Sequence, residues 1–236
     1  MLQTVMDVNQ WCLGHPNYVV HADDPAWQDR RSEVITGSEV ASLMGLNPWR
    51  GREALLESYL RPSPWHDNHK TFWGRQLESA VLDGYGKLTG LRVVNTNAFF
   101  IRDGIGATID GLIDPDSFES LLPASEGYVG TTAPSYWRKT HEQLCYLLGR
   151  DKPVICECKV TSERNKADWG KEVPAYYVAQ LQAQMWATDL DVSVIVAKIG
   201  AYDIRHHVVE RDEPFQLRMV EEAERFMEEV DVARSF

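Results

Sequence analysis

The part of the chain between Pro153 and Val209 constrains the fold more than any other. It contains a short apolar run, a helical pattern that begins after Pro174, and two more apolar runs separated by Gly200. We therefore expect strands at 154–160, 192–199 and 202–209 and a helix at about 175–188. Strands and a helix in this order predict a sheet with a helix packed against it.

The preceding and following sequence extends this pattern. Thr36 and Glu39 have the spacing of a capping box at the start of a helix, which Pro48 is expected to end. Similar reasoning predicts helices at about 74–87 and 214–230 and strands between 91 and 113 with a turn at 102–104. The order of elements predicts an α/β fold, with a mixed central sheet flanked by helices.

Length and composition indicate one domain. The chain has 236 residues, 44% of them hydrophobic, and no linker-like segment, so we expect a single domain over 1–236. The segment at about 116–152 fits the pattern poorly, because it contains Gly127, Gly130 and Pro134 before a possible helix at 136–148. We interpret it as an insertion into the core.

The chain carries no signal for a membrane or for secretion. It has no apolar run long enough for a membrane span and no basic N-terminal segment followed by an apolar stretch, which predicts a soluble cytoplasmic protein. Its cysteines form no C-x-x-C pair, so we expect reduced, buried thiols at Cys12, Cys145, Cys156 and Cys158.

The formal net charge is −11, which by itself argues against a nucleic-acid partner. A metal-dependent nuclease, however, gathers carboxylates at its site, where bound cations and nearby arginines reverse the local field. The total charge therefore requires only that DNA meet a local basic patch.

Glu157 and Lys159 lie two residues apart in a predicted strand. The strand period of two places both side chains on one face, with Cys156 and Cys158 on the other face, toward the core. A carboxylate that holds Mg²⁺ beside a lysine that steadies or deprotonates water suits metal-assisted hydrolysis. The alternative is an exposed salt bridge, which is the commoner reason for this pattern.

Three further polar positions are candidates only in combination. Asp110 lies among small and apolar residues, where an unpaired carboxylate is costly. Glu78 lies on a predicted helix, and Gln180 shares a face of the later helix with Gln184. Alone, these residues fit a turn, a paired surface glutamate and a polar helix surface.

Five short motifs follow one another along the chain: R-S-E-V-I-T-G-S-E-V at 31–40, G-x-x-x-E at 74–78, I-D-G at 109–111, E-C-K at 157–159 and A-Q-L-Q at 179–182. This ordered set resembles the lambda exonuclease and YqaJ-type viral recombinase family, which belongs to the PD-(D/E)xK nucleases. The resemblance runs from about Trp27 onward, except for the insertion. It implies a restriction-endonuclease-like core.

The resemblance also implies the roles of the catalytic residues. Asp110, Glu157 and the backbone carbonyl of Cys158 would hold Mg²⁺, for which Mn²⁺ can substitute. Glu78 would support a second ion, and Lys159 would act on the attacking water.

Other residues would place the water and the DNA. The resemblance implies that Gln180 helps to position the water. Arg31 and Ser38, with Thr36 and Thr108 as weaker candidates, would bind the 5′-phosphate of a DNA end. The alternative for this region is an ordinary capped helix.

The activity implied by the resemblance is 5′-to-3′ hydrolysis of one strand of linear duplex DNA, leaving 3′ overhangs for single-strand-annealing recombination. It also implies a ring-shaped homo-oligomer, with a trimer expected first, and an annealing protein as partner. The chain departs from the family at Ile109, where a proline is usual, and in the long gap between Asp110 and Glu157. That gap keeps open an endonuclease of the same fold, and an inactive DNA-binding protein is a third alternative.

Overall fold

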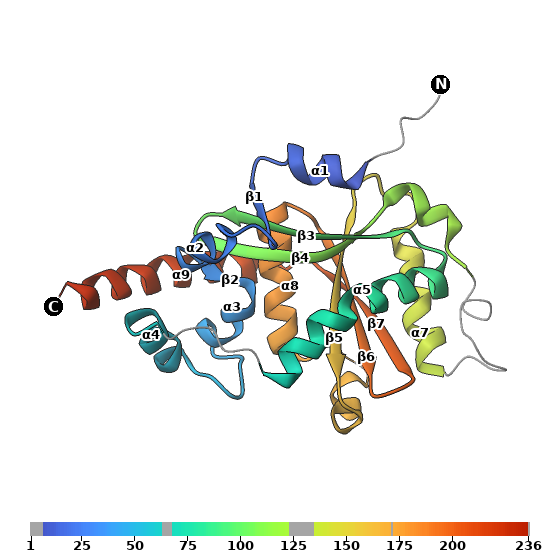
Figure 1. Ribbon diagram of the computed structural model, residues 1–236. Coiled ribbons are helices and arrows are strands. Elements are labelled where there is room, and N and C mark those ends of the chain that lie inside the picture. Colours follow the sequence, from blue (N-terminus) through green and yellow to red (C-terminus); the bar gives the residue numbers. More distant parts are fainter. Residues whose placement is uncertain (1–6, 63–67, 123–134, 171, 236) are drawn as a thin grey trace.

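A computed structural model describes residues 7–62, 68–122, 135–170 and 172–235 of the chain (Figure 1). Its centre is a mixed sheet in the order β1-β3-β4-β5-β6-β7, with β2 beside β4. The β2–β4 and β5–β6 pairs are parallel, and the other pairs are antiparallel. The strands are β1 (Tyr18–His21), β2 (Ile35–Thr36), β3 (Val93–Arg102), β4 (Ile105–Ile113), β5 (Val154–Thr161), β6 (Val192–Ile199) and β7 (Asp203–Glu210).

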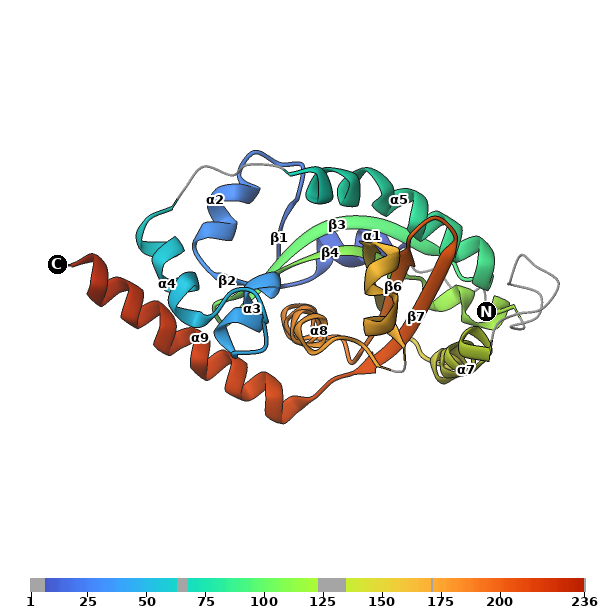
Figure 2. The same ribbon diagram turned by 90° about the horizontal axis from the view of Figure 1, so that it is seen from below.

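Helices lie on both faces of this sheet (Figure 2). The α-helices are α1 (Val8–Gly14), α2 (Trp27–Ser32), α3 (Gly37–Leu43), α4 (Arg52–Leu60), α5 (His69–Thr89), α7 (Ser135–Leu144), α8 (Ala175–Thr188) and α9 (Glu213–Arg234). Short 3₁₀ helices are η1 (Pro115–Ser120), η2 (Cys145–Leu147) and η3 (Glu163–Trp169). In the described ranges, none of the helices is long and apolar enough to span a membrane.

The core lies in layers on the two faces of the sheet. On one face, α5, α7 and η2 pack side chains such as Leu82, Tyr85 and Leu147 against Cys156 and Val194. On the other face, α8 packs against the strands. A third apolar cluster joins α3, α4, α8 and α9. The sheet is thus sandwiched between helices, and the predicted mixed α/β fold is confirmed.

Strands β4 and β5 form a fork. They are paired only where Gly111–Ile113 meets Val154–Cys156. Beyond this short ladder, β4 continues in its hairpin with β3, whereas β5 continues alongside β6. In Figure 1 the β3–β4 hairpin runs across the view and β5–β7 run steeply away from it. The fork opens a space between two strands of one sheet, and the side chains at 110 and 157–159 lie where it opens.

The elements predicted most accurately have strong local signals. Helix α8 spans the predicted 175–188. The β3–β4 turn lies at Asp103 and Gly104, whose φ values of 47° and 72° are typical of a tight hairpin turn. The capping box of Thr36 and Glu39 at the start of α3 is also confirmed.

Two expectations need correction. Helix α3 ends before Gly45, which adopts a left-handed φ of 70°, so this glycine and not Pro48 stops the helix. Cys145 is exposed, because it follows α7 at the surface, whereas the other three cysteines are buried. The insertion at about 116–152 stays a prediction, and its residues Phe118, Leu144 and Leu147 are buried in the core.

Candidate active site

The strand β5 brings the E-x-K pair to the open side of the fork. Glu157 and Lys159 share one face of β5, and Cys156 and Cys158 belong to the apolar cluster on the other face, as the period of two predicts. Glu157 is only 1% exposed, and Lys159 forms an ion pair with its Oε1. The pair is therefore not an exposed surface salt bridge.

Helix α8 supplies two more donors to Glu157. The amide nitrogen of Gln180 donates to Oε1 at 2.6 Å, and that of Gln184, one turn later, donates to Oε2 at 2.6 Å. Lys159 also lies 5.2 Å above the ring of Tyr177 from the same helix. A fully buried carboxylate needs such partners, and here they fix the plane of the carboxylate from both sides.

Where β4 and β5 separate, the side chain of Asp110, and not a backbone carbonyl of β4, accepts the hydrogen bond from the backbone of Cys158. The acceptor is Oδ2 of Asp110, 2.9 Å from the backbone nitrogen of Cys158. The last direct strand pairing is one residue further along β4, at Gly111. Asp110 thus bridges the fork with its side chain and lies beside the E-x-K strand.

Three carboxylates near the fork, those of Glu78, Asp110 and Glu157, repel one another. Burial, followed by the charges of Glu157 and Glu78, raises the pKa of Asp110 well above its ordinary value. Burial and the charge of Glu157 raise the pKa of Glu78 to about 7, against the opposing effect of Lys159. Such mutual repulsion favours protons or a cation between the carboxylates.

Lys159 stays protonated in this setting. Burial alone would lower the pKa of its ammonium group, but the negative charges of Glu157 and Asp110 raise the pKa above the usual range. In the chain without a metal ion, Lys159 is therefore a hydrogen-bond donor and a positive charge.

The donors at the fork suit a hard cation. In the described ranges, acidic, histidine and cysteine side chains do not already form a group of three around one point. Mg²⁺ does not need such a group, since it is usually held by one or two carboxylates together with waters and substrate phosphates. Asp110, Glu157 and the carbonyl of Cys158 are all oxygen donors, and a cation would offset the burial and the neighbouring negative charges that raise the pKa of Asp110.

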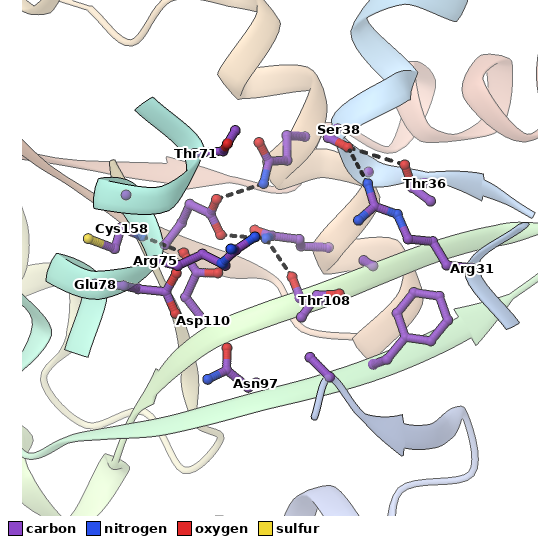
Figure 3. Close-up of a pocket in the computed structure, with 18 of the residues that line it drawn as sticks. Arg31, Thr36, Ser38, Thr71, Arg75, Glu78, Asn97, Thr108, Asp110 and Cys158 are labelled. Atoms are coloured by element: carbon purple, nitrogen blue, oxygen red, sulfur yellow. Dashed lines mark hydrogen bonds between the residues drawn. The ribbon is translucent and has the colours of Figure 1, made fainter. Parts of the chain in front are cut away.

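A cavity of about 870 Å³ extends from the fork to the start of α3. It is lined by all ten residues singled out from the sequence: Arg31, Thr36, Ser38, Glu78, Thr108, Asp110, Glu157, Cys158, Lys159 and Gln180. Figure 3 shows Glu78, Asp110 and Cys158 at one end and Arg31, Thr36 and Ser38 at the other. Residues from α2, β2, α3, α5, β4, β5 and α8 thus share one cavity.

The second end of the cavity is polar and basic. The guanidinium of Arg31 donates to Ser38 Oγ at 3.3 Å and lies over the ring of Trp27, 5.1 Å from its centroid. The indole N–H of Trp27 in turn donates to Thr108 Oγ1 at 3.3 Å. The hydroxyl of Thr36 donates to Glu39 at 2.7 Å, so it also serves the helix cap.

A sequence model of the YqaJ-like viral recombinase domain matches residues 26–191, which is most of the chain and includes both ends of this cavity. The chain belongs to the YqaJ-like viral recombinase family. Among curated proteins, this family member is similar to protein D345L of African swine fever virus, with 28% identity over 161 residues. The match covers 67% of this chain and 44% of D345L, so the chain spans less than half the length of that relative.

Solved structures share the fold of this YqaJ-like chain. The alkaline exonuclease of Laribacter hongkongensis has a TM-score of 0.61 at 18% identity, over 90% of this chain and 95% of that one. A second structure of that enzyme, in complex with dAMP, superposes equally well. A phage-related exonuclease of Haemophilus somnus 129PT has a TM-score of 0.54 at 14% identity, over 85% of this chain and 96% of that one.

The structure also adds residues to the site that sequence reasoning did not assign. The sequence pattern predicts only that Gln184 shares a helix face with Gln180, whereas in the structure it contacts Glu157 directly. Trp27 contacts both Arg31 and Thr108, and Arg75 of α5 lines the cavity close to Glu78 (Figure 3). The W-G-R-Q-L-E run at 73–78 places Arg75 one helical turn before Glu78, and this spacing is a signal that could have found it.

Proposed function

We propose that this YqaJ-like recombinase domain is a Mg²⁺-dependent exonuclease that hydrolyses one strand of linear duplex DNA from its 5′ end. The observation that carries the proposal is the meeting of Asp110, Glu157 and Lys159 at the β4–β5 fork, in one cavity with Arg31 and Ser38. A carboxylate pair beside a protonated lysine suits phosphodiester hydrolysis, and an arginine with a hydroxyl suits a terminal phosphate.

Asp110, Glu157 and the carbonyl of Cys158 would hold the first ion, and Glu78 would support a second. A bound Mg²⁺, or Mn²⁺ in its place, supplies Lewis-acid stabilisation of the charge on the phosphate. To bind the ion, the carboxylate of Glu157 must direct at least one oxygen lone pair away from the side chains that donate to it, which are those of Lys159, Gln180 and Gln184. The high pKa of Glu78 means that it gives up a proton to do so at neutral pH.

Lys159 and Gln180 would act on the attacking water. Because Lys159 is held protonated by the neighbouring carboxylates, it is suited to orient the water and to offset the charge that develops on the phosphate. Gln180 lies beside it on Glu157 Oε1 and offers its amide oxygen as an acceptor for the same water.

Arg31 and Ser38, with Thr36 and Thr108, would bind the 5′-phosphate of the DNA end. Arg31 is held over Trp27 and bonded to Ser38, so a donor of fixed position faces the cavity. An arginine forms the strongest such contact, because it pairs with two phosphate oxygens at once. Anchoring the end at a fixed distance from the fork would make cleavage depend on a free end.

The family resemblance is also the basis for a proposed location, assembly and product. We propose that one domain over 1–236 acts in the host-cell cytoplasm as a ring-shaped homo-oligomer, a trimer in the first instance, and leaves 3′ overhangs for an annealing protein. A ring would confine positive side chains to a channel and so reconcile the net charge of −11 with DNA binding. A monomer in light scattering would contradict the ring.

Digestion of linear duplex DNA in Mg²⁺ tests the activity. The duplex carries a 5′-phosphate at one end only, and each strand has its own label. We expect loss of the 5′-phosphorylated strand alone, while its complement survives as a single strand.

Two controls separate the alternatives. A closed circle should be spared, and Lys159→Ala protein should cut nothing. Cutting of the circle would instead show an endonuclease of the same fold, and an intact substrate under all conditions would show a DNA-binding protein without activity.

A further inference from the structure

Helix α8 contains two buried glutamines, Gln182 and Gln184, which have different surroundings. Gln182 is 2% exposed and Gln184 is 1% exposed. Gln182 is satisfied at both ends, because it donates to the carbonyl of Glu210 at 2.8 Å and accepts from the backbone N–H of Asp212 at 2.9 Å. It therefore ties α8 to the start of α9.

Gln184 faces the fork instead. Its amide nitrogen donates to Oε2 of Glu157 at 2.6 Å and to the backbone carbonyl of Thr108 at 3.0 Å. Both partners are acceptors only, so the NH₂ group must be the end that faces them. The orientation of this amide is thus forced by its neighbours.

This orientation is unfavourable for the amide oxygen of Gln184. Oε1 of Gln184 is buried and has no hydrogen-bond partner among the described residues. A buried acceptor without a partner is unfavourable, and an apolar side chain such as those of the neighbouring Leu181, Ala183 and Met185 would avoid this cost. A role for the NH₂ group at the fork explains why a polar side chain lies here.

We propose that Gln184 is a positioning residue for the metal-binding carboxylate. It holds Glu157 from the Oε2 side, while Lys159 and Gln180 hold Oε1, and it ties this carboxylate to β4 through Thr108. The carboxylate plane is then fixed relative to Asp110, two residues along the same strand as Thr108. This inference rests on the proposed metal site and adds a residue to it.

The matched pair Gln184→Met and Gln182→Met tests this role. Methionine has a similar length and is apolar, so each variant removes the hydrogen bonds of one amide and preserves volume. Mg²⁺ binding to the full chain is measured by calorimetry without DNA. Steady-state kinetics on linear duplex and thermal unfolding are measured on the same preparations.

We expect Gln184→Met to bind Mg²⁺ about tenfold more weakly and to lose kcat, with KM for DNA unchanged, because groups that orient metal ligands typically change affinity by this order. Its Tm should change little, since the unpartnered Oε1 is removed as well. Gln182→Met should bind Mg²⁺ and turn over normally but unfold about 5 °C earlier, because it loses the two hydrogen bonds that tie α8 to the start of α9.

Wild-type Mg²⁺ affinity and kcat in Gln184→Met would overturn the proposal, as would a lower Tm as its only change. Should the methionine variant not fold, Gln184→Asn, which is too short to reach both partners, is judged by the same criteria. A wild-type chain that binds Mg²⁺ and cuts no DNA would overturn the proposed function, and the metal affinities alone would then decide the role of Gln184.

Discussion

The two ends of the β4–β5 pair differ in what they contribute to the molecule. At the paired end, Gly111–Ile113 and Val154–Cys156 are joined by backbone hydrogen bonds, and their side chains are apolar and buried. At the open end, one to three residues away, the backbones separate and Asp110, Glu157 and Lys159 occupy the gap.

In the proposed function, one pair of strands thus serves stability at one end and chemistry at the other. The paired end gains free energy from burial and regular hydrogen bonds. The open end works against folding, since the crowded carboxylates of Asp110 and Glu78 have raised pKa values in the folded chain. Substitutions at the two ends should therefore separate activity from stability.

The largest effect is expected at the open end. Asp110→Asn removes a charge that, in the proposed site, would bind the cation and that its neighbours repel. Activity on linear duplex should fall by about 10³-fold, which corresponds to about 4 kcal/mol of transition-state stabilisation. The Tm of the protein without metal should stay the same or rise. Substantial Mg²⁺-dependent cleavage by Asp110→Asn would contradict the assignment of the chemistry to the open end.

The paired end should respond in the opposite way. Ile113→Ala empties a fully buried position opposite Val154 and should lower the free energy of unfolding by about 2–5 kcal/mol. Denaturant unfolding measures this loss. The kcat of the protein that remains folded should equal that of wild type, and a fall in kcat matching Asp110→Asn would show that the two ends are not separable.

The far end of the cavity provides a third, smaller effect. Arg31→Ala should raise KM about tenfold for a duplex with a 5′-phosphate, because one charge-assisted contact is lost. KM for a duplex with a 5′-hydroxyl should not change. Arg30→Ala is the control, since Arg30 is exposed and pairs with Glu33. Equal effects of both substitutions would argue against a phosphate site.

The smallest effect concerns pH. Because the pKa of Glu78 is raised to about 7, this group stays protonated up to neutrality in the folded chain. Its ordinary pKa is 4.5, so the folded state without metal loses stability as pH rises between these values. Protons compete with the cation over the upper part of this range, and calorimetry should show severalfold tighter Mg²⁺ binding at pH 8 than at pH 6. In Glu78→Gln this pH dependence should be weaker, and an unchanged dependence would exclude Glu78 as its source.

The elements that carry the residues at the fork could be predicted from sequence, because their signals are local. The period of two in β5 placed Glu157 and Lys159 on one face, and Pro174 with a helical pattern gave α8. The ordered motifs also indicated one common site, and the structure has their residues, from seven elements, in one cavity.

The remaining features depend on contacts distant in sequence. Gln184 lies 27 residues from Glu157 and 76 from Thr108, so only the packing of α8 over the fork reveals its hydrogen bonds. Strand β2 has two residues and no periodicity, and it exists because it pairs with β4. Cys145 belongs to an apolar residue type, but the end of α7 leaves it at the surface.

The central claim is that the open end of the β4–β5 fork binds the catalytic cation. The most direct test is the anomalous difference map of a crystal of this chain soaked in Mn²⁺. The account predicts a peak in contact with carboxylate oxygens of Asp110 and Glu157 and with the carbonyl of Cys158. A Mn²⁺-active protein whose only peak lies away from these three groups would contradict it.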